Sequence, residues 1–143
     1  MKTATTAVSF LCVIGVLTVA CGNDNTPSTP TTPLLPSSEV FTGTLGAQGS
    51  SFYSFTVATS GNVSITLASL VPKAPGPAVN TVMGLGVGTP DGTTCAVTNS
   101  VTTAPGLTAQ LVNSLTPATY CAKIYDLGQL TGPVDFAVRI VHP

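Results

Sequence analysis

Four cysteines, one histidine and five carboxylates are the side chains of this 143-residue chain that could carry covalent, acid–base or metal chemistry. A serine or cysteine nucleophile needs a base within hydrogen-bonding reach, and the only histidine, His142, stands beside the final residue. We expect its imidazole to be solvated at a strand end. The carboxylates are scattered over separate segments, so no paired acid and base is expected. The sequence therefore predicts no catalytic residue and no enzyme.

Asp91 and Asp126 have a second interpretation as calcium ligands. Ca²⁺ accepts oxygen ligands from flexible loops, and these two carboxylates could join backbone oxygens around such an ion. The chain has no dense acidic loop, however, and aspartate is common in turns. Turn-forming aspartates are the expectation, with no metal and no cofactor.

The cysteines divide by their position along the chain. Cys12 lies inside an apolar leader and Cys21 directly follows it, which leaves Cys95 and Cys121 as the remaining pair. A zinc site would need closely spaced cysteines or nearby histidines, and this pair has neither. A disulfide between Cys95 and Cys121 is the prediction, as expected for a chain outside the reducing cytosol.

The first 20 residues have the layout of a secretory signal. Lys2 supplies a positive charge, and Ala7–Ala20 (AVSFLCVIGVLTVA) is uncharged and mostly apolar. A membrane-spanning helix needs about 20 consecutive apolar residues, which is more than this segment offers. We therefore expect residues 1–20 to form a cleaved signal helix.

The end of the leader, Leu17-Thr18-Val19-Ala20-Cys21, resembles the lipobox of bacterial lipoproteins. The resemblance implies that Cys21 is the lipidation site and the first mature residue, so the expected partner is a membrane, reached through a lipid anchor. Gly22 stands where an aspartate would resemble an inner-membrane retention signal. The resemblance thus implies a location in the cell envelope, at the outer membrane and facing the periplasm or the cell surface. An ordinary leader followed by an incidental cysteine is the alternative.

Composition defines the rest of the chain. Residues 21–38 are rich in threonine, proline and serine, which predicts an extended linker without a core of its own. Residues 39–143 have the length of one domain. With four Lys and Arg residues and a net charge of −1, the chain lacks the basic cluster that nucleic-acid binding requires. A protein or glycan partner remains open.

Beyond Glu39 the polarity alternates with period two, which predicts half-buried strands. Apolar residues alternate with Ser and Thr in both SFYSFTV and VSITL, and the intervening ATSGN predicts a hairpin between these two strands. Further strand-sized segments follow, among them GLTAQLV, ATYCAKIY and PVDFAVRIV. The predicted fold is all-β, a two-sheet antiparallel β-sandwich that is jelly-roll-like.

One predicted strand carries glycine at every second position. In MGLGVG, the bulky residues would enter the core and the opposite face would have no side chains. Such a face permits either tight packing of a neighbour or a flat contact with a ligand, and tight packing is the commoner outcome. Two aromatic residues are expected to face outward. The candidate ligand surface, for a carbohydrate or matrix molecule, therefore comprises Phe52, Tyr125, Gly84, Gly86 and Gly88.

Four stretches together resemble the bacterial pre-peptidase C-terminal (PPC) domain: GTLGAQGSSFYSFTVATSGNVSITL, VMGLGVGTPDGTTC, LVNSLTPATYCAKIYD and PVDFAVRIVH. The matching residues are Gly43, Leu45, Tyr53, Phe55, Val57, Pro90, Asp91 and Gly92. Domains of this family accompany exported enzymes and are not catalytic themselves. The resemblance implies a PPC-like accessory or interaction domain in a non-catalytic, lipid-anchored envelope protein. A carbohydrate- or extracellular-matrix-binding module is the alternative.

Overall fold

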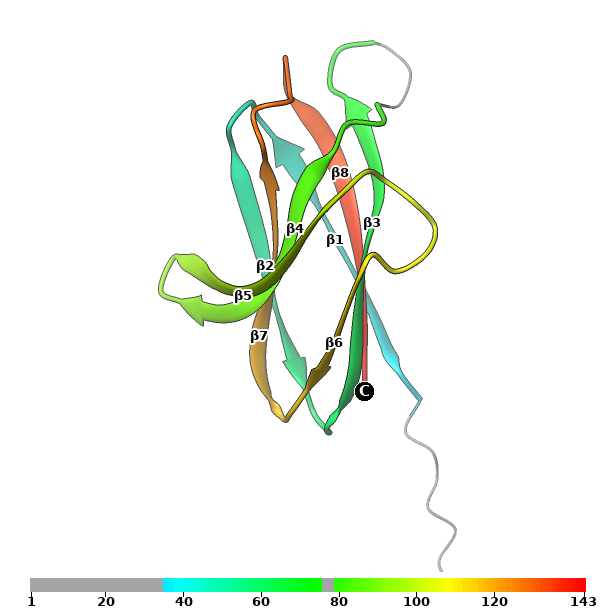
Figure 1. Cartoon of the computed structure of the whole chain (residues 1–143), viewed down its shortest axis with the longest axis vertical. Coiled ribbons are helices and arrows are strands. Elements are labelled where there is room, and N and C mark those ends of the chain that lie inside the picture. The colour runs from blue at the N-terminus through cyan, green and yellow to red at the C-terminus, as the bar shows by residue number, and fades with distance from the viewer. Residues whose placement is uncertain (1–34, 76–78) are drawn as a thin grey trace, which may run out of the picture. The chain divides into compact units, whose positions relative to one another are not determined.

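The computed structural model describes residues 35–75 and 79–143, which form eight β-strands and no helix (Figure 1). The signal segment, Cys21 and residues 22–34 of the linker lie outside the described residues. Within the described part, no helix is long and apolar enough to cross a bilayer. The strands are β1 (Ser37–Leu45), β2 (Ser50–Val57), β3 (Gly61–Pro72), β4 (Met83–Asp91), β5 (Thr94–Thr103), β6 (Leu111–Leu115), β7 (Ala118–Asp126) and β8 (Val134–His142).

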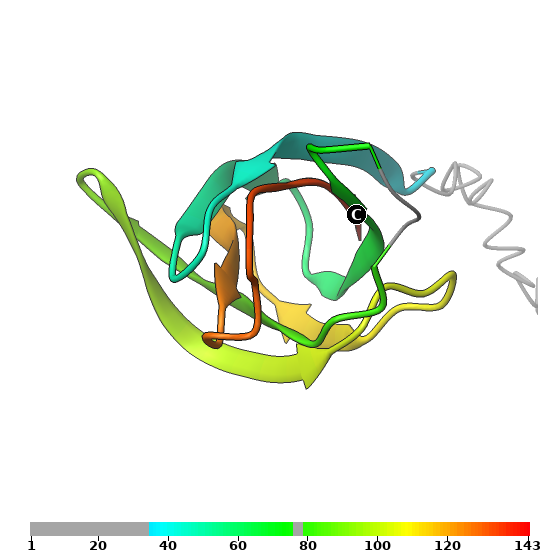
Figure 2. The same ribbon diagram turned by 90° about the horizontal axis from the view of Figure 1, so that it is seen from above.

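The strands form two four-stranded antiparallel sheets, in the orders β1-β8-β3-β6 and β2-β7-β4-β5. Strand β1 pairs with β8, β2 with β7, β3 with β6, and β4 with β5. This pairing is that of one long hairpin rolled up so that successive strand pairs alternate between the sheets, which is the jelly-roll arrangement. Seen from above, the two sheets curve around a common core (Figure 2). The predicted antiparallel β-sandwich is confirmed.

The predicted hairpin between the second and third strands is wrong. β2 and β3 belong to different sheets, so residues 58–60 carry the chain from one sheet to the other. Val57 and Val63, on either side of this turn, both face the core and are 1% exposed. Polarity alternation shows which side chains face inward, and it is the same whether two successive strands share a sheet or face each other across the core.

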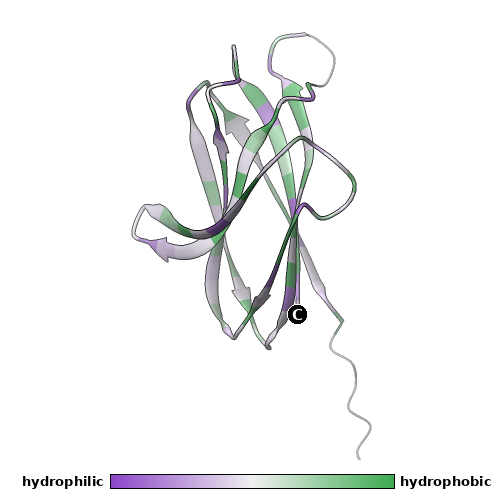
Figure 3. Cartoon of the chain, viewed as in Figure 1, coloured by the Kyte–Doolittle hydropathy of each residue, from purple (hydrophilic) through white to green (hydrophobic). Residues whose placement is uncertain are grey.

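The core lies between the sheets and consists of the inward-facing residues of both. Polar and apolar positions alternate along the strands (Figure 3). Phe41 and Phe136 meet edge to face, with ring centroids 4.9 Å apart. The side chains least exposed to solvent include Ile65, Leu67, Leu70, Met83, Leu85, Ile124 and Ile140. Non-directional apolar burial of this kind is the main stabilising term of such a domain.

The segment GLTAQLV is only partly a strand. Leu107 is 91% exposed, and residues 104–110 form the connection between β5 and β6. Strand β6 begins at Leu111 and pairs with β3 from Gly61 to Ile65. Beyond Ile65 the Gln110 side chain takes over: its Oε1 accepts from the Leu67 N–H at 2.8 Å, and its Nε2 donates to the Leu67 carbonyl at 3.4 Å. A side-chain amide therefore continues the ladder along β3.

Candidate functional site

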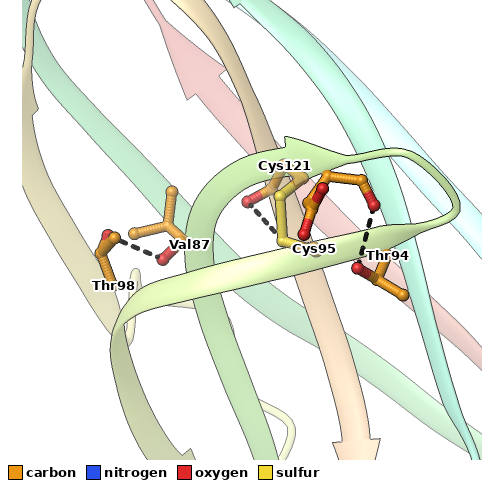
Figure 4. The surroundings of a disulfide bond; sticks show 6 residues. Val87, Thr94, Cys95, Thr98 and Cys121 are labelled. Atoms are coloured by element: carbon orange, nitrogen blue, oxygen red, sulfur yellow. Dashed lines mark hydrogen bonds between the residues drawn. A yellow bond between two sulfur atoms is a disulfide. The ribbon is translucent and has the colours of Figure 1, made fainter.

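The predicted disulfide is present and joins β5 to β7. Cys95 and Cys121 are 5% and 0% exposed, and their Cα atoms lie 5.9 Å apart (Figure 4). Because β4 lies between β5 and β7, a flat sheet would place their Cα atoms roughly 9–10 Å apart. The start of β5 must therefore fold over the outer face of β4 to bring the two cysteines together.

A β-bulge and a glycine permit this folding. The β4–β5 register shifts between Val87 and Gly88, where Thr98 is the extra residue and donates through Oγ1 to the Val87 carbonyl at 3.2 Å (Figure 4). A Cβ on Gly88 would overlap the Ala96 backbone, so only glycine lets β5 approach this closely. Gly88 is therefore required for the path of β5.

The other two glycines of β4 are covered as well. A Cβ on Gly84 would overlap the ring of Tyr125, which is the register partner of Gly84 on β7. A Cβ on Gly86 would lie 2.7 Å from Cγ1 of Val97. All three glycines are buried. The prediction that they form an open, flat ligand surface is wrong, because Tyr125 and β5 of the same chain occupy that face.

Phe52 and Tyr125 do share the outer face of one sheet. Phe52 is the register partner of Lys123, and Tyr125 follows two residues later on β7. All three side chains are half-buried. The structure thus brings the two predicted aromatic residues to the same region, where Tyr125 fills the space above Gly84 and Phe52 borders a hollow.

This hollow, which we call the Phe52 hollow, has a volume of about 270 Å³ and is open to solvent. β2 and β7 supply part of its lining, and the β4–β5 turn and the start of β5 supply the rest. Its lining residues are Ser50, Ser51, Phe52, Thr93, Thr94, Cys95 and Lys123. Sequence reasoning did not find Lys123 or the threonines. Lys123 meets Phe52 only through the β2–β7 register, and Thr93 and Thr94 come beside it only because the start of β5 folds over.

A second hollow, of about 220 Å³, lies between the β3–β4 and β7–β8 connections. Its lining is predominantly apolar and includes Val79, Leu130 and Val134. Its lining residues include no acidic or basic side chain. It offers no group for acid–base or ionic chemistry.

His142 is not solvated as predicted, since it is 5% exposed. Its Nε2 lies 2.8 Å from Oε1 of Glu39, and Tyr53 donates its hydroxyl hydrogen bond to Oε2 of the same carboxylate. The His142 ring also lies 5.5 Å from that of Phe55. Pairing of β1 with β8 places Glu39 near His142, while the Tyr53 bond crosses from β2 in the other sheet. The Glu39–Tyr53–His142 cluster thus connects the two sheets.

The electrostatics of this cluster follow from its hydrogen bonds. The Tyr53 hydroxyl, opposed in part by burial and assisted by His142, lowers the pKa of Glu39. The Glu39 carboxylate in turn raises the pKa of Tyr53. The Glu39 side chain is occupied by both neighbours and the His142 ring is enclosed. The arrangement therefore serves as a structural connection rather than presenting a free base to a substrate.

Asp126 organises two turns. One carboxylate oxygen accepts from the N–H of Gln48 at 2.8 Å, and the other accepts from the N–H groups of Gln129 and Leu130. Burial raises the pKa of Asp126, but these backbone donors outweigh it, so the pKa is lowered. The carboxylate fixes the β1–β2 turn against the β7–β8 connection.

Asp91 lies far from Asp126. Asp126 pairs with Met83 at the start of β4, whereas Asp91 is eight residues later at the other end of that strand, roughly 25 Å away at the usual rise per residue. The two carboxylates thus cannot share an ion in this fold. Within the described residues, no group of three or more His, Cys, Asp or Glu side chains is placed to hold a metal.

No protein-family model matches the chain, and no curated protein matches it.

Proposed function

We propose that this chain is a non-catalytic, lipid-anchored protein of the bacterial cell envelope whose β-sandwich is an accessory or interaction domain. The Cys95–Cys121 disulfide is the structural observation that carries the proposal. It is buried within the domain and joins two strands across a third, which suits an oxidising compartment outside the cytosol. The leader and Cys21 in the sequence supply the route of export and the anchor.

The resemblance to the PPC domain supports the accessory role. Its motif residues occupy structural positions: Phe55 and Val57 are buried in the core, and Gly92 has a positive φ of 57° in the β4–β5 turn. Residues of this kind support a fold rather than a chemical activity. A PPC-like domain therefore remains part of the proposal, as does its partnership with an exported protein.

Intact-mass analysis of the full chain, expressed in a bacterium and extracted from membranes with detergent, tests the anchor. We expect loss of residues 1–20, the added mass of acyl chains at Cys21, and a two-proton deficit from the disulfide. Cys21→Ser should abolish the acyl mass and release the protein from membranes, while Cys12→Ser should change neither. A mature wild-type protein that keeps its leader, or carries a free thiol at Cys21, would contradict the proposal.

Delivery to the outer membrane is tested separately by density-gradient fractionation of the two membranes. The wild-type chain should sediment with the outer membrane, whereas Gly22→Asp should move toward the inner membrane. Equal distributions of both chains would overturn the role given to Gly22 and leave the lipid anchor itself unaffected.

Carbohydrate or matrix binding is the second candidate function, and the Phe52 hollow favours it. An aromatic ring beside several hydroxyl groups is a surface on which a sugar ring can stack and form hydrogen bonds. The full chain should then bind members of a glycan and collagen array, and Phe52→Ala should weaken that binding. Val112→Ala, which alters an exposed valine on the other sheet, is the matched control. A blank array would exclude this candidate.

A further inference from the structure

The wall of the Phe52 hollow is fixed in place. Thr93, Thr94 and Cys95 line it from the β4–β5 turn and the start of β5, and Cys95 is bonded to Cys121 on β7 of the same sheet. Thr94 also donates through Oγ1 to the Asp91 carbonyl at 3.0 Å, which holds the turn. A wall held by a covalent bond and a hydrogen bond loses little conformational entropy when a ligand binds, so the hollow is preorganised.

Lys123 gives this hollow a charge. In the described residues, Lys123 makes no ion pair, whereas Lys73 lies 3.7 Å from an Asp135 carboxylate oxygen. Asp91, the carboxylate of the adjoining turn, is not among the lining residues. Every other lining side chain is uncharged. An ammonium group beside hydroxyls and without a carboxylate partner favours an anion as the ligand.

The lining groups suit one class of anion better than others. Phe52 offers an apolar face for a pyranose ring, and Ser50, Thr93 and Thr94 offer hydroxyls for the hydroxyls of a sugar. A simple inorganic anion would use the ammonium and leave the aromatic face unused. A carboxylated sugar uses both.

We propose that the Phe52 hollow binds a uronic acid unit of an acidic polysaccharide, with Phe52 stacked on the sugar ring and the Lys123 ammonium bound to its carboxylate. This inference rests on the carbohydrate-binding candidate and names its ligand class. The hollow has room for about one sugar unit, so affinity for a polymer would come from repeated weak contacts by many anchored copies on one surface.

Binding of oligogalacturonate to the full chain in detergent, measured by calorimetry, tests the proposal. The matched ligand is the same oligosaccharide with its carboxyl groups reduced to alcohols. We expect the reduced form to bind at least about fivefold more weakly, because the charge-assisted contact is lost. Inorganic phosphate should compete only weakly, since it cannot stack on Phe52.

Variants assign the effect to the residues. Lys123→Met should lose about the same factor for oligogalacturonate and leave the reduced form unchanged, while Lys123→Arg should retain most of the binding. Phe52→Ala should weaken the binding of both ligands, and Lys73→Met, in the connection between β3 and β4, should weaken the binding of neither. Circular dichroism and the two-proton deficit verify that each variant is folded.

The outcomes separate the two levels of the proposal. Equal binding of the charged and reduced oligosaccharides would overturn the role of Lys123 and leave carbohydrate binding standing. Binding of neither ligand, together with a blank glycan array, would overturn both. Full competition by phosphate at equal concentration would show a general anion site and overturn the assignment to a sugar acid.

Discussion

Glu39 accepts a hydrogen bond from Tyr53 of the other sheet and lies beside His142 of its own sheet, and these contacts give a pH-dependent prediction. Tyr53→Phe removes the phenol donor, so the free energy of unfolding at neutral pH should fall. Because the pKa of Glu39 is lowered in the folded state, this stabilisation is complete above the carboxyl's usual pKa and is lost as the pH falls through the folded value. Urea denaturation at about pH 7 and about pH 3 should show the variant converging on wild type in acid.

Tyr120→Phe is the control for that comparison. The Tyr120 hydroxyl donates to the uncharged carbonyl of Thr116 at 3.1 Å, so its removal should cost similar stability at both pH values. The raised pKa of Tyr53 gives the opposite pH dependence. The stabilisation that it contributes is present below pH 10 and is lost as the pH rises through the folded pKa. If Tyr53→Phe and wild type lose stability in parallel on acidification, Glu39 is not the group responsible.

Gly84 shows how one absent side chain decides the position of an aromatic ring. Gly84→Ala would place a methyl group where the Tyr125 ring lies, which should destabilise the fold by about 1–3 kcal/mol through displacement of that ring. Gly46→Ala should cost far less, because no atom lies within 4 Å of the added Cβ. Thermal unfolding of both variants measures the difference. In a Tyr125→Ala background, Gly84→Ala should cost much less; an unchanged cost would contradict the overlap.

At the residue scale, the contacts and burial of some of these side chains could be predicted from the sequence, and those of others could not. Cys95 and Cys121 were predictable because only one pair remained once the leader and its adjacent cysteine were set aside. The burial of His142 was not, because Glu39 is 103 residues away in sequence and meets it only through the β1–β8 register. Tyr125 and Gly84 likewise meet only through the register of β4 and β7.

At the scale of the strand, the contacts of Gln110 predict how the edge of β3 is stabilised beyond the end of β6. Its carboxamide occupies both hydrogen-bonding groups of Leu67 where β6 no longer pairs with β3. Gln110→Ala would leave the Leu67 N–H without this partner, so the free energy of unfolding should fall by about 1 kcal/mol. Amide hydrogen exchange at Leu67 should accelerate, while exchange at Val63, which β6 still pairs, should change only through overall stability. Equal acceleration at both amides would contradict a local role.

Strand positions and inward faces followed from the alternation of residues, but sheet membership did not. A turn such as ATSGN can close a hairpin or pass between two sheets, and the flanking valines are buried in either case. The prediction of a strand over the whole of GLTAQLV was wrong for a related reason. Its alternation continues that of β6, yet the chain there crosses the side of the sandwich and exposes Leu107. Short-range polarity does not encode which strands become neighbours across long sequence separations.

At the scale of the whole molecule, the disulfide is the main covalent constraint in the described domain. Replacing both cysteines, Cys95→Ala with Cys121→Ala, should lower the free energy of unfolding by about 3.5 kcal/mol, the chain-entropy value for a closed loop of 26 residues. Urea denaturation measures this loss, and reduction of the wild-type protein should reproduce it. Cys12→Ser should have no effect on the mature protein. A loss below about 1 kcal/mol would mean that noncovalent contacts alone hold β5 over β4.

The pairing of Ser37 with His142 places the entry and the end of the sandwich side by side. A pulling force applied between these two points would unzip β1 from β8 one hydrogen bond at a time, instead of shearing all of them together. We expect optical tweezers to record rupture at low force and an extension shorter by about 90 Å than that of the reduced protein, because the crosslink withholds 26 residues of contour length. Such a domain unfolds at low force, yet the loop closed by the disulfide stays compact and can serve as the starting point for refolding.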